Sequence, residues 1–515
     1  MLKLVDLAKH ADFSLGDIRV SPSRRVIEGP AGRAHVQPIV MKLFLVLVQA
    51  DGAVVTRDEL FSKAWGGVFV GDDSLNQAIA RIRKVAAETA PGLFDIETVP
   101  RTGYRMVGPA IEKGKLKNGG AGLPHSRRLF IGAAAANAAL CVTGAAVWTV
   151  QRRSESRFDR LIDDAERQLS VASELNPPAT IATLQQAVAL DPGNARAWGL
   201  LALTQSMVAL SGTPMGATAI DGAEQAARRA VAIDPREPNA QLALYELQGI
   251  TLDWFARDRR LRDIIALDPG NIFAISELVA LLQSAGLTHE SWDWNERAIG
   301  IDPAVPDLLC RRAMKLWIEG RFSAADNVID HARDLWPSNP FVSWVRFLLL
   351  ATTGRAAAGA ALLKENPQIL PPPAVPLWRT ALTALAQPSA SSVAAAKQAC
   401  TGAAQSSAML AAQSAMIAGA LGDVDLAFEI SESLLLWRGR IVHASGNRAS
   451  RIGSDALWRS GVQWLFTPPL QGMRADKRFL PLCDDVGLAA YWRRRGVKPD
   501  YLRGATSLTP EQSTT

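Results

Sequence analysis

Five regularly spaced prolines constrain the fold of this chain more than any other feature. They are Pro192, Pro235, Pro269, Pro303 and Pro337. The last four are 34 residues apart, whereas the first gap is 43, which indicates an insertion near residues 211–216. Glycines at 286, 320 and 354 share the 34-residue spacing and fall midway between prolines. Proline ends a helix, and glycine permits the positive φ of a tight turn. Each 34-residue unit is therefore expected to contain two helices. We therefore expect a stack of helix pairs.

The period and its side chains resemble the tetratricopeptide repeat (TPR) family, which packs two helices into each 34-residue unit. Small residues recur at the crowded position of the second helix, at Ala187, Ala230, Ala298 and Ala332. We expect an all-α TPR-like solenoid over residues 154–440, with about five repeats between 160 and 340 and another inter-helix turn at Gly422. A helical cap over 441–506 would cover the last apolar face, and a disordered tail would follow at 507–515.

The resemblance implies a groove that binds a protein or peptide partner. Four tryptophans are candidates to line this groove: Trp254, Trp292, Trp294 and Trp344. For each of them taken alone, packing between helices is the interpretation that we favour.

Residues 12–108 carry a different pattern. Residues 13–20 and 25–28 alternate like strands, and residues 37–49 have the spacing of an apolar helix. Thr56 followed by Glu59 is a capping box that predicts the start of a second helix. A third helix over about 72–88 would bury Leu75, Ile79, Ile82 and Val85. A strand, a turn and a strand follow at 96–107. Three helices followed by a basic hairpin predict an α+β winged helix.

Several spaced motifs in this domain resemble the effector domain of OmpR/PhoB-type regulators, and the membrane-bound ToxR/CadC-like branch in particular. They include Thr56-Arg57-Asp58-Glu59-Leu60, Ile79-Ala80-Arg81-Ile82-Arg83-Lys84 and Pro100-Arg101-Thr102-Gly103-Tyr104. Only about eleven residues precede the first strand, so we expect no phospho-acceptor domain ahead of it. The signal would then arrive from the C-terminal side.

A helix fits the major groove of DNA, and its exposed side chains reach the base edges. The residues expected to contact DNA are Asn76, Gln77, Ala80, Arg81, Arg83, Lys84, Arg101, Thr102 and Arg105. By the resemblance, Arg83 would hold a phosphate or brace the fold, and Arg101 would reach the DNA backbone or minor groove. Gly103 is expected to need a positive φ, and Tyr104 to pack the hairpin on the helices.

An uncharged apolar stretch at residues 129–150 separates the two patterns. Arginines flank it at 127, 128, 152 and 153, and as a helix it would be about 33 Å long, enough to cross a bilayer. We expect a single transmembrane helix, preceded by a flexible basic linker at 109–128. Eight alanines make the stretch only moderately hydrophobic, so a buried helix in a soluble protein is the alternative.

The sequence contains no nucleotide-binding, metalloprotease or hydrolase motif, and its six histidines are scattered. We therefore expect no enzyme activity, no cofactor and no metal. The four cysteines lack metal-site spacing. Cys310, Cys400 and Cys483 are expected to be buried free thiols, although a disulfide is possible if the C-terminal region is periplasmic.

Together these features predict a multi-domain transcriptional regulator in the bacterial inner membrane. Its N-terminal winged helix would bind promoter DNA in the cytoplasm as a homodimer, and its TPR-like domain would sense a signal in the periplasm. Two alternatives stay open. One is a soluble cytoplasmic regulator with the same domains, and the other is a TPR scaffold protein for envelope assembly.

Overall fold

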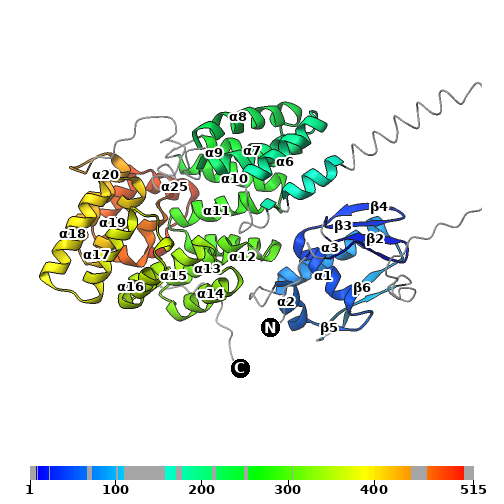
Figure 1. Cartoon of the computed structure of the whole chain (residues 1–515), viewed down its shortest axis with the longest axis horizontal. Coiled ribbons are helices and arrows are strands. Elements are labelled where there is room, and N and C mark those ends of the chain that lie inside the picture. Colours follow the sequence, from blue (N-terminus) through cyan, green and yellow to red (C-terminus); the bar gives the residue numbers. More distant parts are fainter. Residues whose placement is uncertain are drawn as a thin grey trace, which may run out of the picture. The chain divides into compact units, whose positions relative to one another are not determined.

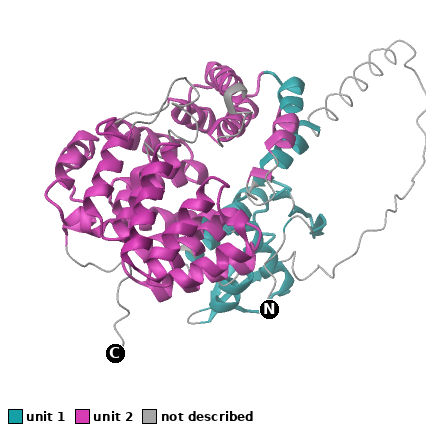
Figure 2. Ribbon diagram, turned by 60° about the vertical axis from the view of Figure 1, so that its left-hand side comes forward, with its two compact units in different colours: residues 1–167, 185–192, 300–303 teal, residues 168–184, 193–299, 304–515 magenta. Residues whose placement is uncertain are grey.

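The computed structural model describes residues 7, 10–22, 24–65, 72–99, 102–108, 157–166, 168–169, 177–210, 216–248, 253–303, 305–441 and 461–503. They fall into two compact units (Figure 2). Within the described ranges no helix is long and apolar enough to span a bilayer. The predicted linker at 109–128, the apolar stretch at 129–150 and the tail at 507–515 lie outside those ranges, as do residues 211–215 of the insertion predicted near 211–216.

A four-stranded antiparallel sheet opens the first unit. Its strands, in spatial order, are β1 (Phe13–Leu15), β2 (Ile18–Ser21), β3 (Val26–Gly29) and β4 (Gly32–His35). The prediction of one strand over 13–20 was wrong, because the chain turns back at Gly16, whose φ is +59°. Leu15 consequently pairs with Ile18. The sequence in fact marks the turn, because Gly16 and Asp17 interrupt the alternation between Leu15 and Ile18.

Three helices and a second sheet complete the winged helix (Figure 1). The helix α3 packs against strands of both sheets. The predicted capping box is confirmed, since the Thr56 N–H donates to Glu59 Oε2 at 3.1 Å and the Glu59 N–H donates to Thr56 Oγ1 at 3.2 Å. The elements are α1 (Pro38–Gln49), β5 (Val55–Thr56), α2 (Arg57–Trp65), α3 (Asp72–Thr89), β6 (Asp95–Val99) and β7 (Gly103–Val107), with sheet order β5-β7-β6.

Gly103 is required for a different reason from the one predicted. It lies in β7 and does not adopt a positive φ. A Cβ atom at this position would lie 1.9 Å from the carbonyl oxygen of Val55. Gly103 is therefore needed because β5 and β7 approach closely, which is a tertiary contact rather than a turn conformation.

Paired helices make up most of the second unit, although residues 185–192 and 300–303 group with the first (Figures 1 and 2). They are α6 (Pro177–Leu190), α7 (Ala195–Leu210), α8 (Gly216–Ile233), α9 (Pro238–Leu247), α10 (Trp254–Leu267), α11 (Ile272–Ser284), α12 (Thr288–Ile301), α13 (Pro306–Ile318), α14 (Phe322–Leu335), α15 (Pro340–Thr352), α16 (Ala356–Glu365), α17 (Ala374–Ala386), α18 (Ala390–Ala404), α19 (Ala408–Ala420) and α20 (Val424–Leu436), with a 3-10 turn η2 (Pro367–Ile369).

The repeat punctuation is confirmed by these boundaries. Helices α6, α8, α10, α12 and α14 each end two residues before one of the five spaced prolines. Gly286, Gly320, Gly354 and Gly422 join the paired helices with φ values between +68° and +78°. The four alanines at the crowded second-helix position are fully buried. Cys310, Cys400 and Cys483 are buried free thiols, and burial raises the pKa of Cys400 and of Cys483 to about 12.

Residues 461–503, here called the C-terminal segment, lie within the predicted cap at 441–506 but cover more than the end of the array. They contact α19 and α20 and also α10, α11 and α12. Figure 1 shows this segment in orange and red beside α19 and α20. Its elements are η3 (Val462–Phe466), η4 (Pro468–Leu470), α23 (Gln471–Ala475), α24 (Phe479–Asp485), α25 (Leu488–Arg495) and η5 (Asp500–Leu502).

Specific contacts hold the C-terminal segment on the helix pairs. The indole N–H of Trp254 donates to the Val486 carbonyl at 2.8 Å, and the indole N–H of Trp492 donates to the Ala285 carbonyl at 2.8 Å. The Pro469 carbonyl lies 2.4 Å from where a Cβ on Gly419 would be, so only glycine allows this approach. Trp254 is 1% exposed and thus packs against the chain itself, as the packing interpretation predicted, rather than lining an open groove.

Candidate nucleic-acid interface

Helix α3 separates its core side chains from its exposed ones with helical periodicity. Leu75, Ile79, Ile82 and Val85 are at most 1% exposed, as predicted. The opposite face presents Asn76, Ala80, Arg81 and Lys84, all of which are exposed. The side chain of Gln77 and residue Arg101 lie outside the described part of the chain.

Arg81 is the most available cation of this face. Within the part of the chain that the structure describes, its guanidinium makes no hydrogen bond or ion pair. Its neighbour Lys84 lies 3.6 Å from Glu88, one helical turn away. Such an exposed pair contributes only about 0.3–0.5 kcal/mol, so DNA phosphate can readily replace Glu88 as the partner of Lys84.

Asn76 is fixed by two neighbours that the sequence pattern did not connect. The Tyr104 hydroxyl donates to Asn76 Oδ1 at 2.8 Å, and Arg57 Nη2 donates to the same oxygen at 3.5 Å. Arg57 Nη1 also donates to the Tyr104 hydroxyl at 3.2 Å. Because a guanidinium only donates, Oδ1 must face Arg57 and the amide Nδ2 must face away from it.

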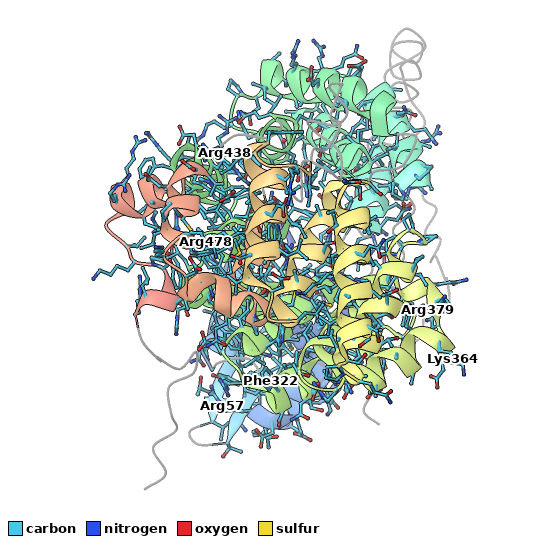
Figure 3. All side chains as sticks on the ribbon, turned by 90° about the vertical axis from the view of Figure 1, so that its left-hand side faces the viewer. Arg57, Phe322, Lys364, Arg379, Arg438 and Arg478 are labelled. Carbon is cyan, nitrogen blue, oxygen red and sulfur yellow. The ribbon has the colours of Figure 1, made fainter. Side chains whose placement is uncertain are left out.

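This network changes what Asn76 can recognise. Bidentate binding of adenine needs the amide oxygen and the amide nitrogen together. The oxygen already accepts two hydrogen bonds, so Asn76 offers only N–H donors to DNA. Arg57, which is labelled in Figure 3, belongs to the site through this role. No helical spacing reveals it, because the pairing of β5 with β7 brings it to Tyr104.

Arg83 faces the wing rather than solvent. Its Nε donates to the Ile96 carbonyl at 2.8 Å and its Nη2 donates to Thr98 Oγ1 at 2.8 Å. Both partners lie on β6, the edge strand of the second sheet. Of the two roles expected for Arg83, the structure shows the one in which it braces the fold.

The wing presents the remaining predicted residues. Arg105 on β7 pairs with Glu97, its cross-strand neighbour on β6, at 2.7 Å. Thr102 is exposed in the turn, where its N–H donates to the Val99 carbonyl. Tyr104 is 4% exposed and packs the hairpin on the helices, which confirms its predicted role.

Known proteins are similar to this chain in the same N-terminal domain. Residues 32–106 match the family model described as "Transcriptional regulatory protein, C terminal". Over 100 residues the chain is 30% identical to the transcriptional activator CadC of Escherichia coli, covering 19% of each protein. Over 68 residues it is 34% identical to the cholera toxin homolog transcriptional activator of Vibrio parahaemolyticus, covering 13% of this chain and 23% of that protein. The chain thus spans about a fifth of the length of these curated relatives.

Among solved structures, that of Pseudomonas aeruginosa pilF aligns with 42% of this chain and 94% of that chain, at 18% identity and a TM-score of 0.29. The assignment of helix pairs rests on the boundaries described above and not on this alignment. For the N-terminal domain, the match, the exposed face of α3 and the sheet order agree. Residues 32–106 therefore form a winged-helix DNA-binding domain of the OmpR/PhoB type.

Proposed function

We propose that this protein is a transcriptional regulator that binds promoter DNA through α3. The observation that carries the proposal is the exposed face of α3, where Arg81, Lys84 and the Asn76 amide lie opposite a fully buried core face. Arg81 has the geometry to bind a guanine with two hydrogen bonds. Asn76 would donate to an acceptor on a base edge, such as guanine O6 or thymine O4.

The test of DNA reading is the variant Arg81→Ala in the full-length protein. Duplexes enriched from a random pool by the unaltered protein supply the binding sites. Loss of a bidentate contact costs roughly 1–3 kcal/mol, so the affinity for these sites should fall by roughly 5- to 150-fold. Affinity for random DNA should change little. The matched control is Arg19→Ala, which removes an exposed arginine from β2. Equal affinities for Arg81→Ala and the unaltered protein would contradict the proposal.

We further propose that residues 129–150 anchor the regulator in the inner membrane, with the winged helix in the cytoplasm. The support is the uncharged composition of this stretch and its arginine flanks. The TPR-like domain would then receive a signal in the periplasm. Pairing of two chains would raise the local concentration of winged helices and so the affinity for paired half-sites.

A soluble regulator is the second candidate function, and two ion pairs favour it. Arg25 Nη2 lies 3.2 Å from Glu166, and both side chains are at most 16% exposed. Arg33 Nη1 lies 3.6 Å from Asp159. Residues 159 and 166 follow the apolar stretch, whereas Arg25 and Arg33 precede it. A membrane between these groups would prevent both pairs.

Topology separates the two candidates. A reporter enzyme that is active only outside the cytoplasm is fused after Arg153 and, in a second fusion, after Thr515. Activity of both fusions, with the protein in the membrane fraction, would support the anchored regulator. Inactive fusions in the soluble fraction would overturn it, and the pairs of Arg25 and Arg33 would then be available in one compartment.

A further inference from the structure

A cavity of about 720 Å³ lies where the C-terminal segment meets the helix pairs. One wall comes from the turn between α11 and α12, and a second from the turn between α13 and α14. The third wall is formed by the C-terminal segment, from η3 to α23 and again at η5. This volume falls within the roughly 300–1,000 Å³ of small-molecule sites.

The glycines of the two turns shape this cavity. A Cβ on Gly286 would lie 2.5 Å from the ring of Phe466, so the segment is seated directly on the first turn. A Cβ on Gly320 would meet no atom within 4 Å, so the second turn leaves open space. Apolar side chains of Ile318, Phe322 and Phe466 complete the walls. Phe322, labelled in Figure 3, is 40% exposed.

Arg474 brings an uncompensated positive charge to this cavity. Its Nη1 donates to the Leu465 carbonyl at 2.9 Å and to the Thr467 carbonyl at 2.6 Å. No carboxylate among the described residues forms an ion pair with it. Burial lowers the pKa of its guanidinium to about 10, which records the loss of solvent around the charge. A guanidinium carries five N–H donors, so several stay available for an anionic ligand.

Glu319 brings a negative charge without a direct partner to the same cavity. Its carboxylate makes no hydrogen bond or ion pair with any residue that the structure describes. Burial raises its pKa, whereas the charges of His289 and Arg321 nearby act to lower it. The other two charged side chains of the lining are already engaged, because His289 Nδ1 lies 3.2 Å from Asp500. Arg474 and Glu319 therefore line one cavity with opposite charges that do not neutralise each other.

Tyr501 also belongs to the lining of the cavity. Its ring packs against the rings of Phe466 and Phe479, with centroids 6.0 and 5.5 Å away. Its hydroxyl is buried and forms no hydrogen bond with the described residues. Arg474 and Glu319 are therefore the groups of the lining that a charged ligand would meet.

We propose that this cavity binds a short peptide with free ends, whose carboxylate meets Arg474 and whose ammonium meets Glu319. A single amino acid would fill only a small part of the volume of about 720 Å³. The peptide would bridge the repeat turns and the C-terminal segment, and would thereby hold that segment on the array. The inference rests on the proposed sensory role of the TPR-like domain and names the class of ligand that this domain detects.

Calorimetric titration of the full-length protein tests the ligand class without DNA, so its outcome is independent of the DNA-binding test. The probes are Ala-Leu-Ala, Ala-Phe-Ala and Ala-Ala-Ala-Ala, each with free ends, with an acetylated amino end or with an amidated carboxyl end. At least one free peptide should bind, and blocking either end should weaken its binding by at least about tenfold. Absence of binding by all three free peptides, or equal binding of free and blocked forms, would overturn the proposal.

The variant Glu319→Gln tests the ammonium site, and it breaks no hydrogen bond or ion pair among the described residues. This variant should bind the free and the acetylated peptides with equal affinity. Amidation of the carboxyl end should still weaken binding as it does for the unaltered protein. Arg474→Lys should weaken the free peptide and reduce the penalty for amidation, because lysine keeps the charge but loses the planar fork. The matched control is Glu365→Gln, an exposed glutamate at the end of α16, which should leave every affinity unchanged. If acetylation still weakens binding to Glu319→Gln, Glu319 is not the group that binds the peptide ammonium.

Discussion

Replacing Arg83 by alanine should loosen the wing. The side chain donates one hydrogen bond to the Ile96 carbonyl and one to the Thr98 hydroxyl, both at 2.8 Å. Hydrogen bonds from a charged donor contribute about 1.5–3 kcal/mol, but the one to Thr98 is solvent-exposed and should contribute little. We therefore expect a local destabilisation of about 2 kcal/mol. Hydrogen exchange of peptides that cover β6 and β7 should accelerate by roughly 30-fold, since 1.4 kcal/mol corresponds to a factor of ten.

The neighbouring Lys84 provides the control for this measurement. Lys84→Ala removes a cation from the same helix but only an exposed pair with Glu88, so exchange in β6 should stay unchanged. Specific and random DNA should both bind Arg83→Ala more weakly, because a displaced wing affects every sequence. Unchanged exchange in β6, together with uniformly weaker DNA binding, would refute the bracing role and make Arg83 a phosphate contact.

Three further perturbations follow from the packing. Gly103→Ala should unpair β5 from β7 and destabilise the winged helix by about 1–3 kcal/mol, because the new Cβ would meet backbone atoms of Val55; wild-type exchange rates in β7 would contradict this. Trp492→Phe should release the segment around α25, which limited proteolysis would detect as earlier cleavage than in Trp437→Phe, a change at a 46% exposed indole. Burial raises the pKa of Glu237 from 4.5 to about 7, so the folded state holds a proton that the unfolded chain loses. The free energy of unfolding should therefore fall by up to about 3 kcal/mol as pH rises through that window, and Glu237→Gln should flatten the dependence measured by urea denaturation.

Local patterns predicted the secondary structure of the repeat domain well. The spaced prolines lie two residues past the helix ends, and the glycines lie at the turns, because both effects act within one or two peptide units. The core face of α3 was equally predictable, since side chains of one helix face recur every three to four residues. At residues 13–20 the turn was missed, although Gly16 and Asp17 interrupt the alternation there.

The functional details depended on contacts between distant residues. Asn76 cannot bind adenine with two hydrogen bonds, because its Oδ1 already accepts from Tyr104, 28 residues away, and from Arg57. Trp254 and Val486 are 232 residues apart, and Trp492 and Ala285 are 207 apart. Contacts at such separations leave no periodic trace in a sequence. The sequence alone thus determined which elements form and which α3 face is exposed. Only tertiary packing decided where the C-terminal segment lies, and that packing encloses Arg474 and Glu319 in one cavity.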